Sequence, residues 1–521
     1  MEKISSPSET CHSLGSIKLP EDVLTEVFYF GFVTPNDVEA SLERDGEFAV
    51  YAIETTALEK TFIFKMAYKA NAKVTHLQIR TTPTLEYYFD DKRFKSRTAQ
   101  TIKKLVKSYI NSKEMPLTEP AKRPAIFIRN DKVQIKHRVG EGNFCFVSKA
   151  VMTGTNRVLK NVAVKNFKDS EITAQTHAEQ KEMMTEISSL SATYHVNIIQ
   201  FYGVLCDVPP IKLVMEFCPG GSLGSHLLSQ KDAIKIGERI LYLFEAARGM
   251  EYLEGISIVH RDLAARNCLI AIDTTLKIGD FGLSLTTQEL SEEKIDGNFK
   301  APIRLLSPET IGKKPLFSHK SDVWAYGMLC WEIFNNGQKP WPDDEVKKIA
   351  RDINTGKMPT VPNTMPPEVK AIVKACWNKD PESRPSFWDI LHKLHKLVNG
   401  KYAPPPPPER STTRIKGVYA KSLDDLNLKA NSPKGRKKNR RIFSVRDDDD
   451  PHHRHKDTVS QQSNATTTTT NSSSGKNSGA ARKKRPVGSV NRTNSLGLVQ
   501  RRSITLPSKS VGQERSKFKR K

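Results

Sequence analysis

The stretch HRDLAARN, residues 260–267, places a carboxylate and a carboxamide five residues apart, at Asp262 and Asn267. A second acid, Asp280, follows eighteen residues after Asp262 and precedes Phe-Gly. Two short apolar runs lie between them, which predicts a hairpin over residues 269–279 that returns Asp280 to the vicinity of Asp262. Carboxylate and amide oxygens are ligands that Mg²⁺ prefers. The sequence therefore predicts Asn267 and Asp280 as metal ligands, and Asp262 as an acid that can accept a proton.

Groups that bind phosphate precede this stretch. A glycine turn at residues 140–142 lies inside the alternating apolar segment 133–151, and its backbone N–H groups suit phosphate oxygens. The next predicted strand carries Lys165, and a predicted helix over residues 177–194 carries Glu186, an acid able to pair with that lysine. Each charge alone is typical of a solvated surface residue. Their order along the chain favours a phosphate-handling site.

As a whole, residues 131–399 resemble a eukaryotic protein kinase domain. The form Leu-Ala-Ala-Arg-Asn at residues 263–267 is similar to that of tyrosine kinases. So is Pro-Ile-Arg at residues 302–304, ahead of Ser-Pro-Glu at 307–309. The resemblance implies two lobes joined near residues 215–218. It also implies transfer of the γ-phosphoryl group of ATP to protein tyrosine hydroxyls, with Mg²⁺ as the metal and Mn²⁺ as the alternative.

The resemblance assigns a role to each matching residue. The catalytic group comprises Asp262, Arg266, Lys165 and Glu186. The metal ligands are Asn267 and Asp280. The residues expected around ATP are Val139, Gly140, Gly142, Asn143, Phe144, Val147, Ala163, Lys165, Glu216 and Cys218. Asp322 and Arg384 are expected to brace the catalytic loop and the helical lobe.

Residues 26–115 have a different pattern, with strands predicted at 46–51, 62–66 and 76–79 and a helix at 98–111. This order resembles an SH2 domain, the module that binds phosphotyrosine peptides. An SH2 domain before a tyrosine kinase resembles the Fer/Fps group of cytoplasmic tyrosine kinases, and the short layout is similar to nematode Fer-like kinases. The expected organisation follows the chain in this order: a short extension 1–25, the SH2-like domain 26–115, a linker 116–130, the kinase domain 131–399 and a basic tail 400–521.

The SH2-like domain departs from its family at the phosphate site. The family strand Phe-Leu-Val-Arg ends in a phosphate-clamping arginine, where this chain has Tyr51. A second arginine is replaced near Pro35, whereas His76 fits a position that lines the pocket. A charge-assisted arginine–phosphate pair contributes about 1.5–3 kcal/mol, so we expect the usual phosphate grip to be lost. The domain could instead dock on the kinase or bind an unmodified peptide. The alternative for Tyr51 is an ordinary aromatic residue of a strand.

The segment between Asp280 and Glu309 contains no tyrosine. Tyrosine kinases commonly order this segment by phosphorylating a tyrosine, whose phosphate pairs with basic residues. We hypothesise that one or more acids of the segment pair with Arg261 instead. These acids are Glu289, Glu292, Glu293 and Asp296. Solvated loop charges are the alternative.

Much of the net charge of +24 belongs to the tail, because residues 401–521 hold 29 Lys and Arg against 9 Asp and Glu. Apolar residues are too sparse there for a core, so disorder is expected. The prolines at 404–408 favour polyproline II and suit a reader of proline motifs, with a stiff spacer as the alternative. The basic clusters at 436–441 and 482–485 fit an anionic lipid, a nucleic acid or an import receptor.

Seven scattered cysteines without a C-x-x-C pair argue against a disulfide framework or a zinc site and fit a reducing compartment. The sequence contains no run of 18 apolar residues, so no membrane-spanning helix is expected. We therefore expect a cytoplasmic signalling enzyme, with peripheral membrane attachment or nuclear entry left open. The competing interpretation is a pseudokinase scaffold that acts through its SH2-like domain and its tail.

Overall fold

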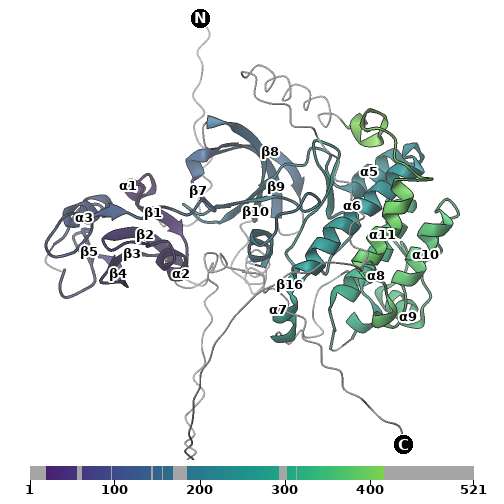
Figure 1. Cartoon of the computed structure of the whole chain (residues 1–521). Coiled ribbons are helices and arrows are strands. Elements are labelled where there is room, and N and C mark those ends of the chain that lie inside the picture. Colours follow the sequence, from purple (N-terminus) through teal and green to yellow (C-terminus); the bar gives the residue numbers. More distant parts are fainter. Residues whose placement is uncertain are drawn as a thin grey trace, which may run out of the picture. The chain divides into compact units, whose positions relative to one another are not determined.

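The computed structural model describes residues 19–54, 62–94, 97–141, 145–154, 157–167, 185–292, 302–312 and 314–415, and the descriptions below concern these residues. They form a mixed α+β chain, with a β-rich N-terminal region followed by two kinase-like lobes (Figure 1). The α+β fold class predicted from the sequence is confirmed. No helix in these ranges is both long enough and apolar enough to cross a membrane.

The N-terminal region is built on one sheet of strand order β1-β2-β3-β4-β5, in which β1 and β2 are parallel and the other neighbours antiparallel. The strands are β1 (Tyr29–Phe32), β2 (Glu47–Glu54), β3 (Phe62–Ala70), β4 (Lys73–Thr81) and β5 (Tyr87–Phe89). The helices are α1 (Glu21–Leu24), α2 (Pro35–Glu39) and α3 (Ile102–Tyr109). The predicted strands 62–66 and 76–79 fall within β3 and β4, the predicted strand 46–51 overlaps β2 from Glu47 on, and α3 lies inside the predicted helix.

Strand β2 separates two cores because successive side chains point to opposite faces. Phe48 and Val50 belong to a buried cluster with residues of α3. Ala49 and Tyr51 belong to another cluster, which continues without a break into residues of the kinase lobes, including Phe127. The second face of the sheet therefore shares its core with the kinase.

The small kinase lobe contains a six-stranded sheet of order β7-β11-β12-β10-β9-β8. Its strands are β7 (Phe127–Ile128), β8 (Val133–Glu141), β9 (Cys145–Thr153), β10 (Leu159–Phe167), β11 (Phe201–Leu205) and β12 (Lys212–Glu216). Lys165 on β10 lies opposite Val147 on β9 and Leu213 on β12. Of the predicted helix 177–194, residues 185–191 are helical, and 177–184 lie outside the described residues.

The large lobe is mainly helical, and its buried helix α6 packs against α11 (Figure 1). Its α-helices are α5 (Leu223–Gln230), α6 (Ile236–Gly255), α7 (Thr287–Glu292), α8 (His319–Phe334), α9 (Val346–Thr355), α10 (Pro367–Cys376) and α11 (Phe387–Val398). Its strands pair as β13 (Ile258–Val259) with β16 (Leu285–Thr286), and β14 (Cys268–Ile270) with β15 (Leu276–Ile278). The β14–β15 pair is the hairpin predicted between Asp262 and Asp280.

Short 3₁₀ helices connect these elements. They are η1 (Asn130–Lys132), η3 (Lys231–Ala233), η4 (Ile303–Leu305), η5 (Pro308–Thr310), η6 (Pro381–Ser383), η7 (Pro407–Glu409) and η8 (Ser411–Arg414). The last two lie in the region that composition predicts to be disordered, and for residues 401–415 that prediction is wrong because Ser411 and Thr412 are buried against the large lobe. Polyproline II was expected over 404–408, but the chain turns into η7 at Pro407. Residues 416–521, with both basic clusters, lie outside the described residues.

The predicted linker 116–130 contributes one short strand to each of the two sheets. Its strand β6 (Glu119–Pro120) pairs with β2 of the N-terminal sheet. Its strand β7 pairs with β11 of the small lobe. Arg123, between these strands, donates to the carbonyl oxygens of Tyr29 and Phe127 and forms a 2.6 Å ion pair with Asp207. The segment therefore attaches both sheets to one short length of backbone.

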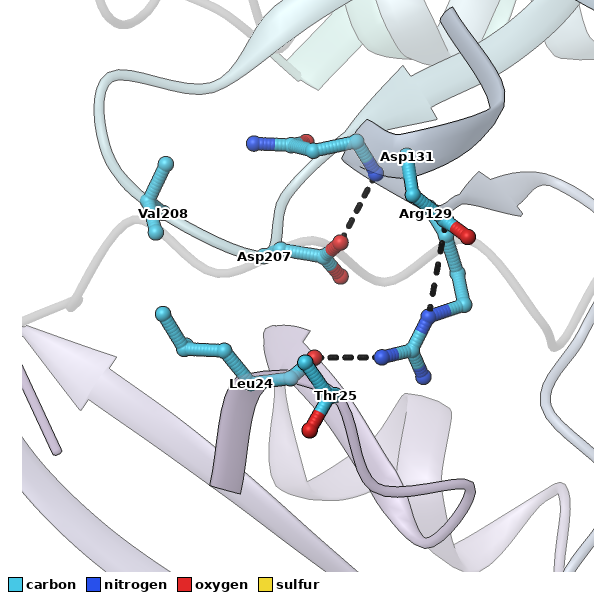
Figure 2. Close-up of a pocket in the computed structure, with 7 residues that line it drawn as sticks. Leu24, Thr25, Arg129, Asp131, Asp207 and Val208 are labelled. Atoms are coloured by element: carbon cyan, nitrogen blue, oxygen red, sulfur yellow. Dashed lines mark hydrogen bonds and ion pairs between the residues drawn. The ribbon is translucent and has the colours of Figure 1, made fainter. Parts of the chain in front are cut away.

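The N-terminal region and the small lobe also meet directly. The backbone N–H of Phe32 donates to the carbonyl oxygen of Cys206 at 2.7 Å, and the Tyr29 hydroxyl donates to the Asp207 carbonyl at 3.0 Å. Figure 2 shows the adjoining pocket, of about 260 Å³, with Arg129 reaching the Leu24 carbonyl. The Asp207 carboxylate accepts the backbone N–H of the residue that follows Arg129. Backbone groups therefore carry much of this contact.

Gly31 is the most constrained position of the contact. Its φ is +90°, and an added Cβ would lie 2.4 Å from the Cys206 carbonyl oxygen. We predict that Gly31→Ala lowers the free energy of unfolding by about 1–3 kcal/mol through backbone strain and steric conflict. Urea titration of the full chain measures this change. Gly255→Ala is the matched control, because a Cβ at the end of α6 meets no atom within 4 Å. Equal effects of the two substitutions would contradict the prediction.

Candidate active site

A three-membered ion cluster links the small lobe to the large lobe. Lys165 Nζ lies 2.6 Å from Glu186 Oε2 and 3.2 Å from Asp280 Oδ1. Glu186 is 2% exposed, and its position at the start of the helical residues 185–191 aims it at β10. Burial alone would lower the pKa of Lys165, but the two carboxylates outweigh it and raise the pKa above its ordinary value. The lysine is therefore held as a cation between the lobes.

Asp262 is fixed by two neighbours on its own loop. The Arg266 guanidinium pairs with Asp262 Oδ1, and Asn267 Nδ2 donates to Asp262 Oδ2 at 2.7 Å. Burial raises the pKa of Asp262 above its ordinary value, although Arg266 and Asn267 oppose the shift. A carboxylate with a raised pKa is the stronger base, which suits a proton acceptor.

The backbone of this loop is anchored by the buried carboxylate of Asp322, in the first turn of α8. Its two oxygens accept the N–H groups of His260, at 2.7 Å, and of Arg261, at 2.9 Å. Arg261 has a φ of +66°, a strained value for a residue with a side chain. Burial raises the pKa of Asp322 to about 7, against the effect of the two N–H groups. Asp322 therefore braces the catalytic loop, in the way the sequence predicts.

The β14–β15 hairpin carries Asp280 back to the loop. The Gly279 N–H donates to the Asn267 carbonyl oxygen at 2.8 Å. Asp280 itself takes a φ of +63°. Phe281 is fully buried, with its ring 4.9 Å from that of His260. The Lys165 ammonium lowers the pKa of Asp280, so this acid is ionised at neutral pH.

The two predicted metal ligands offer oxygen donors of the right kind. Asn267 uses its amide nitrogen on the carbonyl and carboxylate of Asp262, which leaves Oδ1 as the atom able to accept a cation. The Asp280 side chain is 51% exposed and ionised. Mg²⁺ is typically held by one or two protein oxygens, with phosphates and water completing its shell. The residues present therefore fit a magnesium ion bound together with a nucleotide.

The structure assembles part of the predicted ATP-contacting set. Gly140 and Val139 lie on β8, Val147 on β9 and Ala163 on β10. Glu216 ends β12 and pairs with Lys277 at 2.9 Å, and Cys218 follows it. The remaining predicted members, Gly142, Asn143 and Phe144, lie outside the described residues.

Arg384 braces the large lobe through a bidentate pair. Its fully buried guanidinium binds the Glu309 carboxylate at 2.6 and 2.8 Å. Such fork-to-fork pairs are strong and directional. The Pro-Ile-Arg segment is likewise tied to the large lobe, since Arg304 donates to the carbonyl oxygens of Pro340 and Trp341.

The hypothesis that acids of the activation segment pair with Arg261 stays a prediction. Glu289 Oε2 accepts the N–H and the hydroxyl of Thr286. Glu292 accepts the side chain of Gln288. Arg261 donates to the Leu283 carbonyl and lies 5.2 Å from the Phe317 ring centroid. Glu293 and Asp296 are outside the described residues.

Sequence reasoning missed one acid that anchors the catalytic loop from helix α8. Glu332 Oε2 accepts the N–H of Ala265 at 2.8 Å, which fixes the loop from the C-terminal half of α8. Burial raises the pKa of Glu332 to about 7, against the Ala265 hydrogen bond. The available signal was a single acid in the otherwise apolar run 323–334.

Comparisons with known proteins agree with this arrangement. Residues 133–394 match the family model for protein tyrosine and serine/threonine kinases. The chain is 30% identical over 392 residues to Fer-related kinase 1 of Caenorhabditis elegans, covering 73% of this chain and 96% of that protein. It is 33% identical to Spermatocyte protein spe-8 of the same species, over 62% of this chain and 64% of that protein.

The chain is also 30% identical to the rat tyrosine-protein kinase Fer, over 77% of this chain but about half, 49%, of that protein. These identities mark distant relatives, and they include proteins considerably longer than the matched region. The kinase family uses ATP and Mg²⁺ and acts on protein substrates. With the family model spanning both lobes and one relative matched along nearly its whole length, this chain belongs to the protein tyrosine and serine/threonine kinase family and carries a tyrosine kinase domain.

Proposed function

We propose that the chain is an active protein tyrosine kinase, which transfers the γ-phosphoryl group of ATP to tyrosine hydroxyls of protein substrates. The observation that carries the proposal is the pairing of Lys165 with both Glu186 and Asp280. Active kinases require the lysine–glutamate pair and the metal-binding aspartate to be in place together. A scaffold has no need to maintain both contacts across two lobes.

The proposed reaction gives each of these residues a specific role. Asp262 orients the acceptor hydroxyl and takes its proton on a carboxylate whose pKa burial has raised. Asn267 Oδ1 and the Asp280 carboxylate hold Mg²⁺, which supplies positive charge to the phosphate oxygens when bound. Lys165 grips the α- and β-phosphates, and Glu186 fixes its direction.

The preference for tyrosine rests on two features of the large lobe. Arg266 follows Ala-Ala in the catalytic loop and pairs with Asp262, next to the expected position of the acceptor oxygen. Arg304 ties the Pro-Ile-Arg segment to residues 340 and 341. A tyrosyl oxygen stands farther from its backbone than a seryl oxygen, so the supporting segment must differ from that of serine kinases. We assign residues 302–304 to this support.

The SH2-like domain is proposed to work without phosphotyrosine. Tyr51 is fully buried and its hydroxyl lies 2.7 Å from His76 Nδ1. His76 Nε2 in turn lies 2.9 Å from Glu39 Oε1. This chain of side chains fills the position of the clamp and ends in an acid, which repels a phosphate. The contacts of Phe32 and Arg123 with residues 206–207 support a docking role on the kinase instead.

We also propose a kinase subgroup and a cellular location for this chain. An SH2-like domain directly before a tyrosine kinase domain supports membership of the Fer/Fps group in its short form, as in nematode Fer-like kinases. The described cysteines are all free thiols, which supports a reducing, cytoplasmic location. Contact of the tail with an anionic lipid, a nucleic acid or an import receptor stays a proposal from its charge.

We predict that the purified full chain transfers phosphate from Mg-ATP to tyrosine of a mixed Glu/Tyr polymer, as measured by phospho-amino-acid analysis. Asp262→Asn should lower the rate by about 10²–10⁴, because the general base is lost. Asp273→Asn is the matched control, since this exposed acid of the hairpin turn lies outside the assembled residues. Wild-type protein that binds ATP without transferring phosphate would favour a scaffold. Phosphoserine as the main product would exclude the proposed specificity.

The closed phosphate site gives a second prediction. A phosphotyrosine peptide should bind the full chain no more tightly than its unphosphorylated form, as measured by calorimetry. The double substitution Tyr51→Arg with Glu39→Gln should create a preference of at least about tenfold, because it restores a cation and removes the opposing acid. Glu43→Gln, outside the Tyr51–His76–Glu39 chain, serves as the control. A tenfold preference in the wild-type chain would refute the closed site.

A further inference from the structure

The segment 401–415 follows the last kinase helix and lies beyond the residues matched by the family model. It nevertheless packs on the large lobe. Ser411 and Thr412 are 1% and 0% exposed, and Tyr402 and Ile415 pack against the main core cluster. We call residues 401–415 the strap. Buried polar groups are usually hydrogen-bonded. Ser411 and the Thr412 backbone N–H have partners in the lobe, whereas the Thr412 hydroxyl has none among the described residues.

Glu238, in the first turn of α6, is the main partner and is itself 1% exposed. Its carboxylate accepts the backbone N–H of Ser411 at 2.9 Å, the Ser411 hydroxyl at 2.9 Å and the N–H of Thr412 at 3.3 Å. The fourth donor is the Tyr242 hydroxyl at 2.8 Å. The strap thus supplies three of these four hydrogen bonds. Without it, a buried carboxylate would lose most of its compensation, which is energetically costly.

The contacts around Ser411 suit a small hydroxyl residue. His226 on α5 places Nε2 at 2.8 Å from Ser411 Oγ. The Ser411 hydroxyl therefore contacts both α5, through His226, and α6, through Glu238. At Gly237 an added Cβ would lie 2.6 Å from the Ala403 carbonyl oxygen, which shows how closely the strap backbone approaches α6. By contrast, Lys235 and Glu409 form an exposed pair at 3.7 Å, which contributes little.

The strap also reaches the hairpin of the active site. Arg410 Nη1 donates to Thr274 Oγ1 at 3.1 Å, and Thr274, 2% exposed, lies in the turn between β14 and β15. That hairpin separates Asn267 from Asp280. It is tied to α6 as well, because Glu245 Oε2 accepts the Leu276 N–H at 2.8 Å. Burial raises the pKa of Glu245 to about 7, and the nearby Arg410 is among the groups that oppose this shift.

We propose that the strap is a built-in ligand of the large lobe, in which Glu238 recognises Ser411 and Thr412, and that Arg410 of the docked strap braces the hairpin between Asn267 and Asp280. The proposal concerns a docking site formed by α5, α6 and the β14–β15 turn. Its tests do not depend on catalytic activity. They therefore stand whether or not the chain proves to be an active tyrosine kinase.

The first test is amide hydrogen exchange of the full-length chain, with trypsin cleavage after Arg410 as a second readout. In the wild type, the Ser411 and Thr412 amides should exchange at least about tenfold more slowly than unstructured amides. Ser411→Ala removes the hydroxyl contact and should weaken this protection in part. Ser411→Asp places a second carboxylate against Glu238, so it should abolish the protection and expose the Arg410 cleavage site.

Glu409→Gln is the matched control, because it changes a nearby exposed charge and should leave both readouts at wild-type values. Ser411→Asp alters only the strap, so the test does not depend on a lobe variant that fails to fold. Unprotected Ser411 and Thr412 amides in the wild type would overturn the proposal. Full protection retained in Ser411→Asp would overturn the recognition by Glu238.

The bracing of the hairpin is tested with Arg410→Ala in the full chain. Exchange of the Ala271 and Leu276 amides should become at least about threefold faster, because the hairpin turn loses its contact with the strap. Lys401→Ala is the control, since this side chain is 68% exposed and lies at the other end of the strap. Unchanged exchange in Arg410→Ala would show that the strap docks without bracing the hairpin, and would overturn that part.

Discussion

The placement of the catalytic residues depends on one buried carboxylate, that of Asp322. It accepts the backbone N–H groups of His260 and Arg261, and so holds a strained stretch of chain against helix α8. Leaving a buried backbone donor without its acceptor typically costs about 1–3 kcal/mol. Asp262 and Asn267 lie on the same loop, and the hairpin that follows sets Asp280. The positions of Asp262, Asn267 and Asp280 therefore depend on the hydrogen bonds that Asp322 makes with the loop.

Lys165 of the small lobe contacts this arrangement directly. Lys165 is shared between an acid of its own lobe and an acid of the other lobe, so the two lobes are coupled electrostatically as well as by chain connection. The opposed pKa shifts are consistent with this division of labour: the lysine holds Asp280 ionised, whereas burial makes Asp262 a better base. Two acids of similar type thus acquire different properties from their surroundings.

The sequence predicts those residues whose side chains form motifs of fixed spacing. Lys165 pairs with Glu186, and Asp322 and Arg384 make bracing contacts, as the sequence predicts. The role of Asp280 as a metal ligand stays a prediction. Sequence reasoning missed contacts made by backbone groups, such as that of Phe32 with Cys206, because main-chain atoms leave no signature in a sequence. It also missed the strap, because composition averaged over the whole tail conceals fifteen residues that differ from the rest.

The main-chain nature of the contact between the N-terminal region and the kinase has an evolutionary consequence. Where a hydrogen bond joins two backbone groups, as between Phe32 and Cys206, it tolerates drift in both side chains. The bonds made by Tyr29, Arg123 and Arg129 depend on those side chains. Only a few positions, such as Gly31, are restricted by the closeness of the two backbones. Insertions or deletions that shift the backbone near Cys206 would separate the two regions at once. Relatives should therefore preserve loop lengths at this contact, together with the side chains that complete its hydrogen bonds.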